Sequence, residues 1–167
     1  ILLTDINNLD TAMLSILHIG ELTGRIYNSI KMVSEIRDRF YNLNSHLQNK
    51  EKTNAAYLIW QNPYMAAGGE TFIHEMMYYC GLQNIFSDVT RYPAISLQNI
   101  KDRDCELILL SSEPYPFKER HIEEMKNTLS NIKIVLADGE MFSWYGSRLL
   151  KAPAYFKSFR SKYIGEK

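Results

Sequence analysis

Residues 55–86 read AAYLIWQNPYMAAGGETFIHEMMYYCGLQNIF, and this stretch predicts a strand, a glycine turn and a helix. The apolar run Ala55–Trp60 predicts a buried strand that ends before Pro63, because proline lacks a backbone donor and keeps the preceding residue extended. The pair Gly68-Gly69 permits a tight turn. Apolar residues at positions 72, 73, 76, 77 and 80 then recur at helical spacing until Gly81, which is typical of a helix end.

The same order of strand and helix recurs twice further along the chain. Apolar runs at Glu106–Ser111 and Ile132–Ala137 predict two more buried strands. Helices are expected from Ser96, over residues 118–129, and over residues 146–163 with an interruption at Pro153. Strands that alternate with helices indicate a parallel sheet covered on both faces. The predicted fold is therefore α/β, a three-layer α/β/α lobe with a central, mostly parallel sheet.

A long helix is expected before this lobe. Apolar residues step by three and four positions from Ile26 to Leu47, and a continuous helix from Leu9 to Leu47 would be about 58 Å long. Such a helix is too long to be buried across one small sheet, so it should bridge or brace another part, although Gly20 and Gly24 weaken or bend it. The expected organisation is a strand remnant and a long backbone helix in residues 1–50, followed by the α/β lobe in residues 51–167.

Composition argues against several classes of function. Lys plus Arg and Asp plus Glu are both 19 among the 167 residues, so no net charge favours a nucleic-acid partner. No apolar stretch approaches the roughly 20 residues that span a bilayer. Cys80 and Cys105 lack metal-ligand spacing and are expected to be small core residues.

Aromatic residues follow the end of each predicted strand. Because the carboxyl ends of parallel strands meet at one edge of a sheet, these rings should line a shared concavity. A single ring can simply cap the core, but the whole set favours a binding surface for a flat or bulky, partly apolar ligand. The set consists of Trp60, Tyr64, Tyr92, Tyr115, Phe117, Phe142, Trp144 and Tyr145.

Motifs for catalysis are weak. Ser112, His121 and Asp138 could form a triad, but no G-x-S-x-G turn surrounds the serine and His121 lies on a predicted helix. No H-E-x-x-H motif appears, and the glycine pair at 68–69 lacks the features of a dinucleotide or phosphate loop. We therefore expect no enzymatic activity, no catalytic residue, no metal site and no cofactor.

Several motifs occur in an order that resembles a known family. They are Asn62–Ile73 with its glycine turn, Cys80–Phe86 with Gly-Leu-Gln-Asn-Ile-Phe, the aromatic-proline pair that opens Tyr92–Leu97, and Gly20-Glu-Leu-Thr-Gly24. Together they resemble the interlobe helix and second lobe of helical-backbone, or class III, periplasmic substrate-binding proteins of ABC importers. The resemblance covers nearly the whole chain.

The resemblance implies a ligand and a set of residues that face it. Members of this family carry cobalamin, iron-siderophore complexes or haem, so the ligand is expected to be a corrinoid or an iron chelate. Trp60, Tyr92 and the Phe142–Arg148 loop match cleft positions, and Glu140 matches an acidic contact of the cobalamin binders. The full expected ligand-binding set is Trp60, Tyr64, Met65, Tyr92, Tyr115, Glu140, Phe142, Trp144, Tyr145 and Arg148.

The resemblance also implies a partner and a location. The chain would deliver a metal chelate to an ABC permease in the inner membrane, from the periplasm or cell envelope. The neutral Gln98 stands where the family uses an acidic residue to dock on the permease. The family's first lobe has no counterpart in these residues, so we expect either a part of a longer protein or another role. The alternatives are a small-molecule-modifying enzyme or sensor on a flavodoxin-like fold, and a protein-interaction module.

Overall fold

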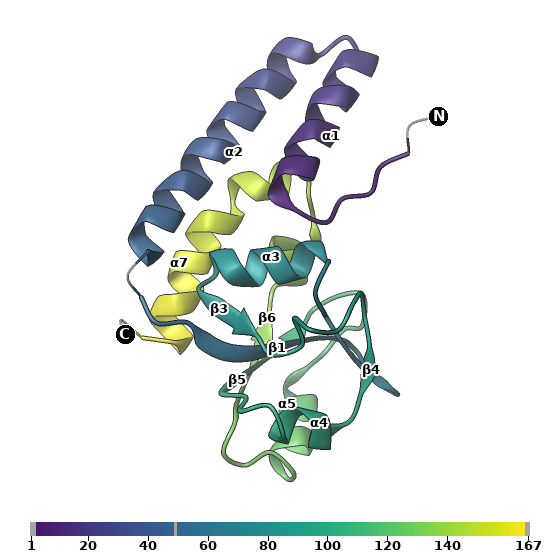
Figure 1. Ribbon diagram of the computed structural model, residues 1–167, viewed down its shortest axis with the longest axis vertical. Helices are drawn as coiled ribbons and strands as arrows, with labels where there is room; N and C mark the ends of the chain where they lie inside the picture. Colours follow the sequence, from purple (N-terminus) through teal and green to yellow (C-terminus); the bar gives the residue numbers. More distant parts are fainter. Residues whose placement is uncertain (1–2, 49, 166–167) are drawn as a thin grey trace.

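The computed structural model describes residues 3–48 and 50–165, which form a six-stranded sheet with helices around it (Figure 1). The strand order is β4-β2-β1-β5-β6, and β3 also pairs with β1. The pairs β1–β3, β1–β5 and β5–β6 are parallel, whereas β2 is antiparallel to both β1 and β4. The strands are β1 Thr53–Trp60, β2 Tyr64–Ala66, β3 Leu82–Asn84, β4 Ala94–Ile95, β5 Leu107–Ser111 and β6 Lys133–Ala137.

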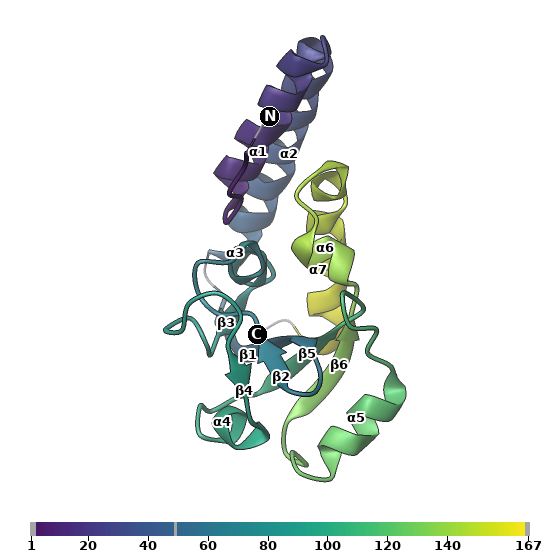
Figure 2. The same cartoon turned by 90° about the vertical axis from the view of Figure 1, so that its right-hand side faces the viewer.

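Helices cover both faces of this sheet. Helices α3, α6 and α7 lie on one side, and α4 and α5 lie on the other (Figure 2). This arrangement confirms the predicted three-layer α/β/α fold with a mostly parallel sheet. None of the described helices is both long and apolar enough to cross a membrane. The helices are α1 Leu9–Leu22, α2 Ile26–Leu47, α3 Phe72–Tyr79, α4 Leu97–Lys101, α5 Glu119–Lys126, α6 Gly139–Ser143, the 3₁₀ helix η1 Ser147–Leu150, and α7 Ala152–Tyr163.

The two faces of the sheet have separate cores. Side chains alternate along β1, so Tyr57 packs into one core and Leu58 into the other. The first core contains residues of α3 and α7, and it extends to Val33, Ile36 and Phe40 of α2. The α1–α2 segment therefore shares its core with the lobe.

The predicted single helix from Leu9 to Leu47 is wrong. Two helices, α1 and α2, form an antiparallel hairpin that rises from the lobe (Figure 1). The chain reverses at Gly24, whose φ of 66° is in the left-handed region that favours glycine. At Gly20 a Cβ would lie 2.1 Å from Ser29 Oγ, so glycine is what allows the two helices to approach closely. A strand remnant was also expected at the start of the chain, before the helix. Residues 1 and 2 lie outside the described part of the chain, and Leu3 is not in a strand.

Proline 153 begins a helix instead of interrupting one. It lies in the first turn of α7, where the missing N–H costs no intrahelical hydrogen bond. The preceding residues form the short η1, so the expected helix from residue 146 starts several residues later. The strands β2, β3 and β4 were not predicted, because each has only two or three residues.

Candidate functional site

The carboxyl ends of β1, β5 and β6 lie at one edge of the sheet. Leu58 of β1 pairs with Leu110 of β5, and Ser111 of β5 pairs with Ala137 of β6. Beyond these strands, Ser112 N donates to Ala137 O at 3.0 Å. We call the surface formed by the segments that follow these strands the rim. It comprises residues 60–65, 112–117 and 138–148, together with Tyr92. Figure 2 looks toward the side of the molecule that lies at the right of Figure 1, where these strands end.

The first group of rim side chains surrounds Trp60. Its ring meets that of Tyr115 edge to face, with centroids 5.6 Å apart and planes at 67°. The Tyr115 hydroxyl donates to Gln61 Oε1 at 2.7 Å, which fixes the phenol ring. Trp60 remains 42% exposed, so a partly fixed apolar surface faces solvent here.

The second group surrounds Trp144. The Glu113 carboxylate accepts hydrogen bonds from the Trp144 indole N–H and from Ser143 Oγ. The Arg148 guanidinium lies 5.8 Å from the centroid of the Trp144 ring and forms an ion pair with Glu140. The two carboxylates and the guanidinium therefore have partners, and the exposed part of this group is mainly the Trp144 ring. The loop after β5 joins both groups, since Glu113 contacts Trp144 and Tyr115 contacts Trp60.

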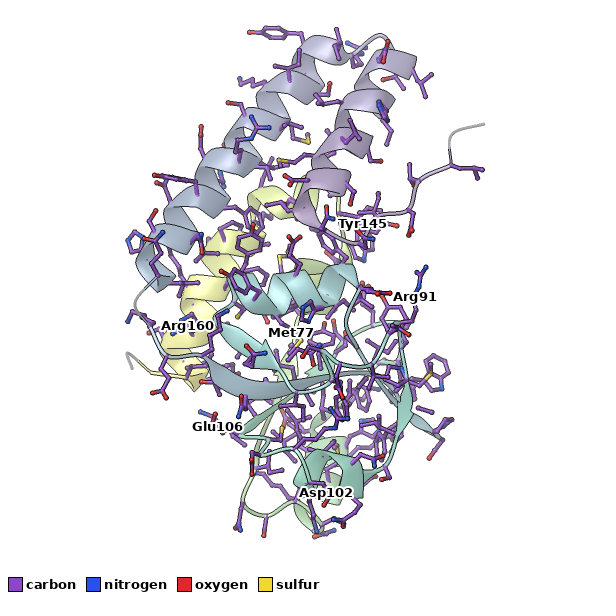
Figure 3. The ribbon with its side chains drawn as sticks, in the orientation of Figure 1. Met77, Arg91, Asp102, Glu106, Tyr145 and Arg160 are labelled. Carbon is purple, nitrogen blue, oxygen red and sulfur yellow. The ribbon has the colours of Figure 1, made fainter. Side chains whose placement is uncertain are left out.

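Tyr145 and Tyr92 extend the rim toward α3. The Tyr145 ring packs edge to face on Phe72, with centroids 5.7 Å apart. Burial raises the pKa of Tyr92; the charge of Arg91 opposes this rise, and the phenol of Tyr145 adds to it. Backbone hydrogen bonds hold this loop, because Gly68 N donates to Arg91 O at 2.8 Å. Figure 3 shows Arg91 and Tyr145 on the same side of the molecule.

An apolar cavity of about 600 Å³ lies between α1 and residues 143–146. Sequence reasoning missed the contribution of α1, because a single straight helix would not fold back to the lobe. The sequence feature that could have indicated this fold is Gly24, where the chain turns between α1 and α2. The lining residues are Thr4, Ile6, Ser15, Ile16, Ile19, Ser143, Trp144, Tyr145 and Gly146.

The prediction that Phe142 faces a ligand is wrong. Its side chain is fully buried and packs on Tyr57 and Phe156, with centroids 5.0 and 4.9 Å away. Helix α6 turns this ring into the first core. Phe117 is likewise buried, in the second core.

Two further members of the predicted set lie in β2. Tyr64 is half-buried and packs against the second core. Met65 is half-buried and is paired with Trp60 of β1 and Ala94 of β4. The rim residues with the most exposed rings are therefore Trp60, Tyr92, Trp144 and Tyr145.

The suggested triad is not assembled. The Ser112 hydroxyl accepts from Gly139 N at 2.9 Å. His121 is buried, its Nδ1 accepts from Lys118 N at 2.8 Å, and its Nε2 lies 3.3 Å from the Tyr115 hydroxyl. Within residues 3–48 and 50–165, no group of three or more His, Cys, Asp or Glu side chains is placed to hold a metal ion.

Comparison with known proteins identifies the fold. No family model matches the chain, and no curated protein matches its sequence. Solved structures match it over 90% or more of its length. A possible iron-binding periplasmic solute-binding protein from Staphylococcus epidermidis matches 96% of the chain with 23% identity and a TM-score of 0.78. The periplasmic haem-binding protein RhuT from Roseiflexus matches 90% with 12% identity and a TM-score of 0.75.

A third matching structure is named for a different ligand. The periplasmic vitamin B12-binding protein BtuF of Vibrio cholerae matches 95% of the chain with 17% identity and a TM-score of 0.73. The chain spans 64%, 64% and 65% of the length of these three structures. The chain thus has the fold of a large part of periplasmic solute-binding proteins, which confirms the fold that the motif resemblance implied. All three matched structures are described as binding proteins.

Proposed function

We propose that this chain is a substrate-binding component of an ABC-type importer, and that it captures a metal chelate and delivers it to a membrane permease. The observation that carries the proposal is the exposed aromatic rim at the carboxyl ends of three parallel strands. Open α/β sheets bind ligands at this edge. The likeness to solute-binding proteins described as iron-, haem- and vitamin B12-binding supports a cobalamin, ferric siderophore or haem as the ligand.

The rim suits a bulky, partly flat chelate. Trp60, Trp144 and Tyr145 are 42%, 49% and 46% exposed, and each ring is fixed on one side by another aromatic ring or by a hydrogen bond. Such rings offer a large contact area with few rotamers to freeze on binding. Glu140 and Arg148 pair with each other beside the Trp144 ring, so in this proposal they orient the loop that carries Trp144.

In this proposal, the α1–α2 hairpin is the stiff connection to a first lobe, which would form the other half of the ligand cleft. Helix α2 contains 22 residues, and Arg39 Nη1 donates to Leu150 O of η1, which ties the helix to the lobe. In this proposal, residues 1–50 connect and residues 51–167 form the ligand-binding lobe. A stiff, core-sharing connection favours a small closing motion around the chelate.

The proposed location is the periplasm or cell envelope, and the proposed partner is an inner-membrane ABC permease. Gln98 is exposed on α4 and donates to Asp102 Oδ1 at 2.7 Å. A carboxylate therefore lies beside the neutral side chain. We propose that the Asp102 carboxylate makes the acidic docking contact with the permease in place of the side chain at position 98.

Tryptophan fluorescence tests the proposal, because the sequence contains two tryptophans, Trp60 and Trp144. The full-length protein is titrated with cyanocobalamin, haemin and a ferric siderophore, with N-acetyltryptophanamide as the control for light absorption. We expect saturable quenching by at least one chelate, and expect Trp60→Phe and Trp144→Phe each to remove part of it. If none of the three chelates quenches beyond the control, the proposal is wrong.

A further inference from the structure

His121 is a buried histidine that contacts the rim from helix α5. It is the third residue of α5 and only 2% of its surface is exposed. Its Nδ1 accepts a hydrogen bond from Lys118 N at 2.8 Å, as the third residue of a helix does when it caps the residue before the helix. A ring nitrogen that accepts a hydrogen bond carries no proton. The ring is therefore neutral, and its single proton is on Nε2.

The Nε2 proton of His121 points the hydrogen bonds toward the rim. Nε2 lies 3.3 Å from the Tyr115 hydroxyl and donates to its oxygen, and the hydroxyl proton in turn is donated to Gln61 Oε1 at 2.7 Å. Arg120 Nε also lies 3.3 Å from Nε2, but two donors would face each other there, so the exposed guanidinium is not the partner of the ring. The hydrogen bonds thus run in one direction, from α5 through Tyr115 to the residue after β1.

The Tyr115 ring links the buried imidazole to an exposed indole. Its centroid lies 5.5 Å from that of His121 and 5.6 Å from that of Trp60. On its other contact the imidazole meets the ring of Phe117 edge to face, with centroids 5.4 Å apart, and Phe117 is only 4% exposed. The imidazole is therefore held by the second core, and it restrains a phenol on which the half-exposed Trp60 packs.

We propose that His121 is a positioning residue for the rim, which holds Tyr115 in the orientation that supports Trp60 and does not itself touch the ligand. Capping of α5 uses only Nδ1, whereas the contact of Nε2 goes to the rim. A ring that is already fixed loses less conformational freedom when a ligand covers it. The inference rests on the proposed function, because Trp60 is there one of the rings that contact the chelate.

Fluorescence of Trp60 without any chelate tests the positioning. In a Trp144→Phe background Trp60 is the single tryptophan. His121→Leu fills the site but removes both hydrogen bonds, so the emission should shift to the red and the anisotropy should fall. His121→Gln keeps an acceptor for the backbone N–H of residue 118 and a donor for Tyr115, so it should restore the emission and anisotropy of the background protein.

The matched control is Met125→Ala, which removes a buried side chain from the same helix and the same core. It should lower stability in urea denaturation, yet leave the emission and anisotropy of Trp60 unchanged. Circular dichroism checks that each variant is folded. The proposal is overturned if His121→Leu leaves the Trp60 signal unchanged, or if Met125→Ala alters that signal as much as His121→Leu does.

Titration of the full-length protein with cyanocobalamin, haemin and a ferric siderophore tests the consequence for binding. For a chelate that binds, the dissociation constant should be about fivefold higher in His121→Leu and within about twofold of the unsubstituted value in His121→Gln. Equal dissociation constants in all three proteins would overturn the role of His121 in binding. Absence of binding to the unsubstituted protein contradicts the proposed function alone, because the Trp60 measurement contains no chelate and decides separately whether His121 holds the ring.

Discussion

The indole N–H of Trp144 donates a hydrogen bond to the carboxylate of Glu113, a residue 31 positions earlier in the chain. Glu113 follows β5, and Tyr115 of the same loop packs on Trp60. One loop therefore positions both tryptophans of the rim. This arrangement makes the rim a connected surface that individual substitutions can probe.

Substitution of Glu113 should release the Trp144 ring. In a Trp60→Phe background, where Trp144 is the tryptophan that reports, Glu113→Ala should shift the emission to the red and lower the anisotropy. The loss in stability should be about 1 kcal/mol, because one partly exposed hydrogen bond is lost. An unchanged spectrum and anisotropy would show that Glu113 does not hold the ring.

Neighbouring aromatic residues should differ sharply in their contribution to stability. Phe142→Ala should lower the free energy of unfolding by about 3–5 kcal/mol, because a fully buried ring is lost from the core. Trp144→Ala, at a half-exposed position two residues later, should cost about 1–2 kcal/mol, because it loses the hydrogen bond to Glu113 and only part of a buried ring surface. Urea denaturation measures both. Similar losses in the two variants would contradict the assignment of Phe142 to the core and Trp144 to the rim.

The close contact of α1 with α2 should depend on Gly20. A Cβ at this position would lie 2.1 Å from Ser29 Oγ and 2.5 Å from Ser29 Cβ, so Gly20→Ala should destabilise the protein by about 1–3 kcal/mol. Thermal unfolding measures the effect. Ser34→Ala, at an exposed position of α2, is the control and should change stability little. A more stable Gly20→Ala protein would argue for a continuous helix in place of the hairpin.

Glu75 should make stability depend on pH. Its carboxylate accepts a hydrogen bond from Leu9 N at the start of α1, yet burial raises its pKa above the ordinary 4.5. A raised folded-state pKa gives stability that is present below about pH 4.5 and is lost as pH rises through the folded value. The stability of Glu75→Gln relative to the unsubstituted protein should therefore increase between about pH 4 and pH 7. Urea denaturation across this range measures it, and parallel pH profiles would contradict the assignment.

The elements that were predicted from sequence are those with a strong local pattern. Strands β1, β5 and β6 are apolar runs between polar loops, and α3 lies between a glycine turn and Gly81. Strands β2 and β4 are too short for a periodic signal and depend on backbone pairing, such as Ala66 N to Pro93 O at 3.1 Å. The hairpin depends on the contact of Gly20 with Ser29, which apolar periodicity does not report.

The rim was predictable in part for the same reason. Residues that follow parallel strands lie at one edge of the sheet, so Trp60 and Tyr115 could be placed together from sequence. The direction of Phe142 could not, because it depends on how α6 packs on Tyr57. Ile16 and Ile19 reach the cavity beside Trp144 only because α1 folds back, and no local pattern in their own segment indicates that contact.

A calorimetric titration of the full-length protein with cyanocobalamin, haemin and a ferric siderophore tests the proposed role of the rim most directly. The comparison is between the unsubstituted protein, Trp144→Ala, and Tyr41→Ala, which removes a 73% exposed ring of α2 outside the rim. We predict that at least one chelate binds and that Trp144→Ala weakens it by about tenfold, while Tyr41→Ala leaves it within about twofold. Absence of binding for all three chelates, or equal losses in the two variants, would contradict the account.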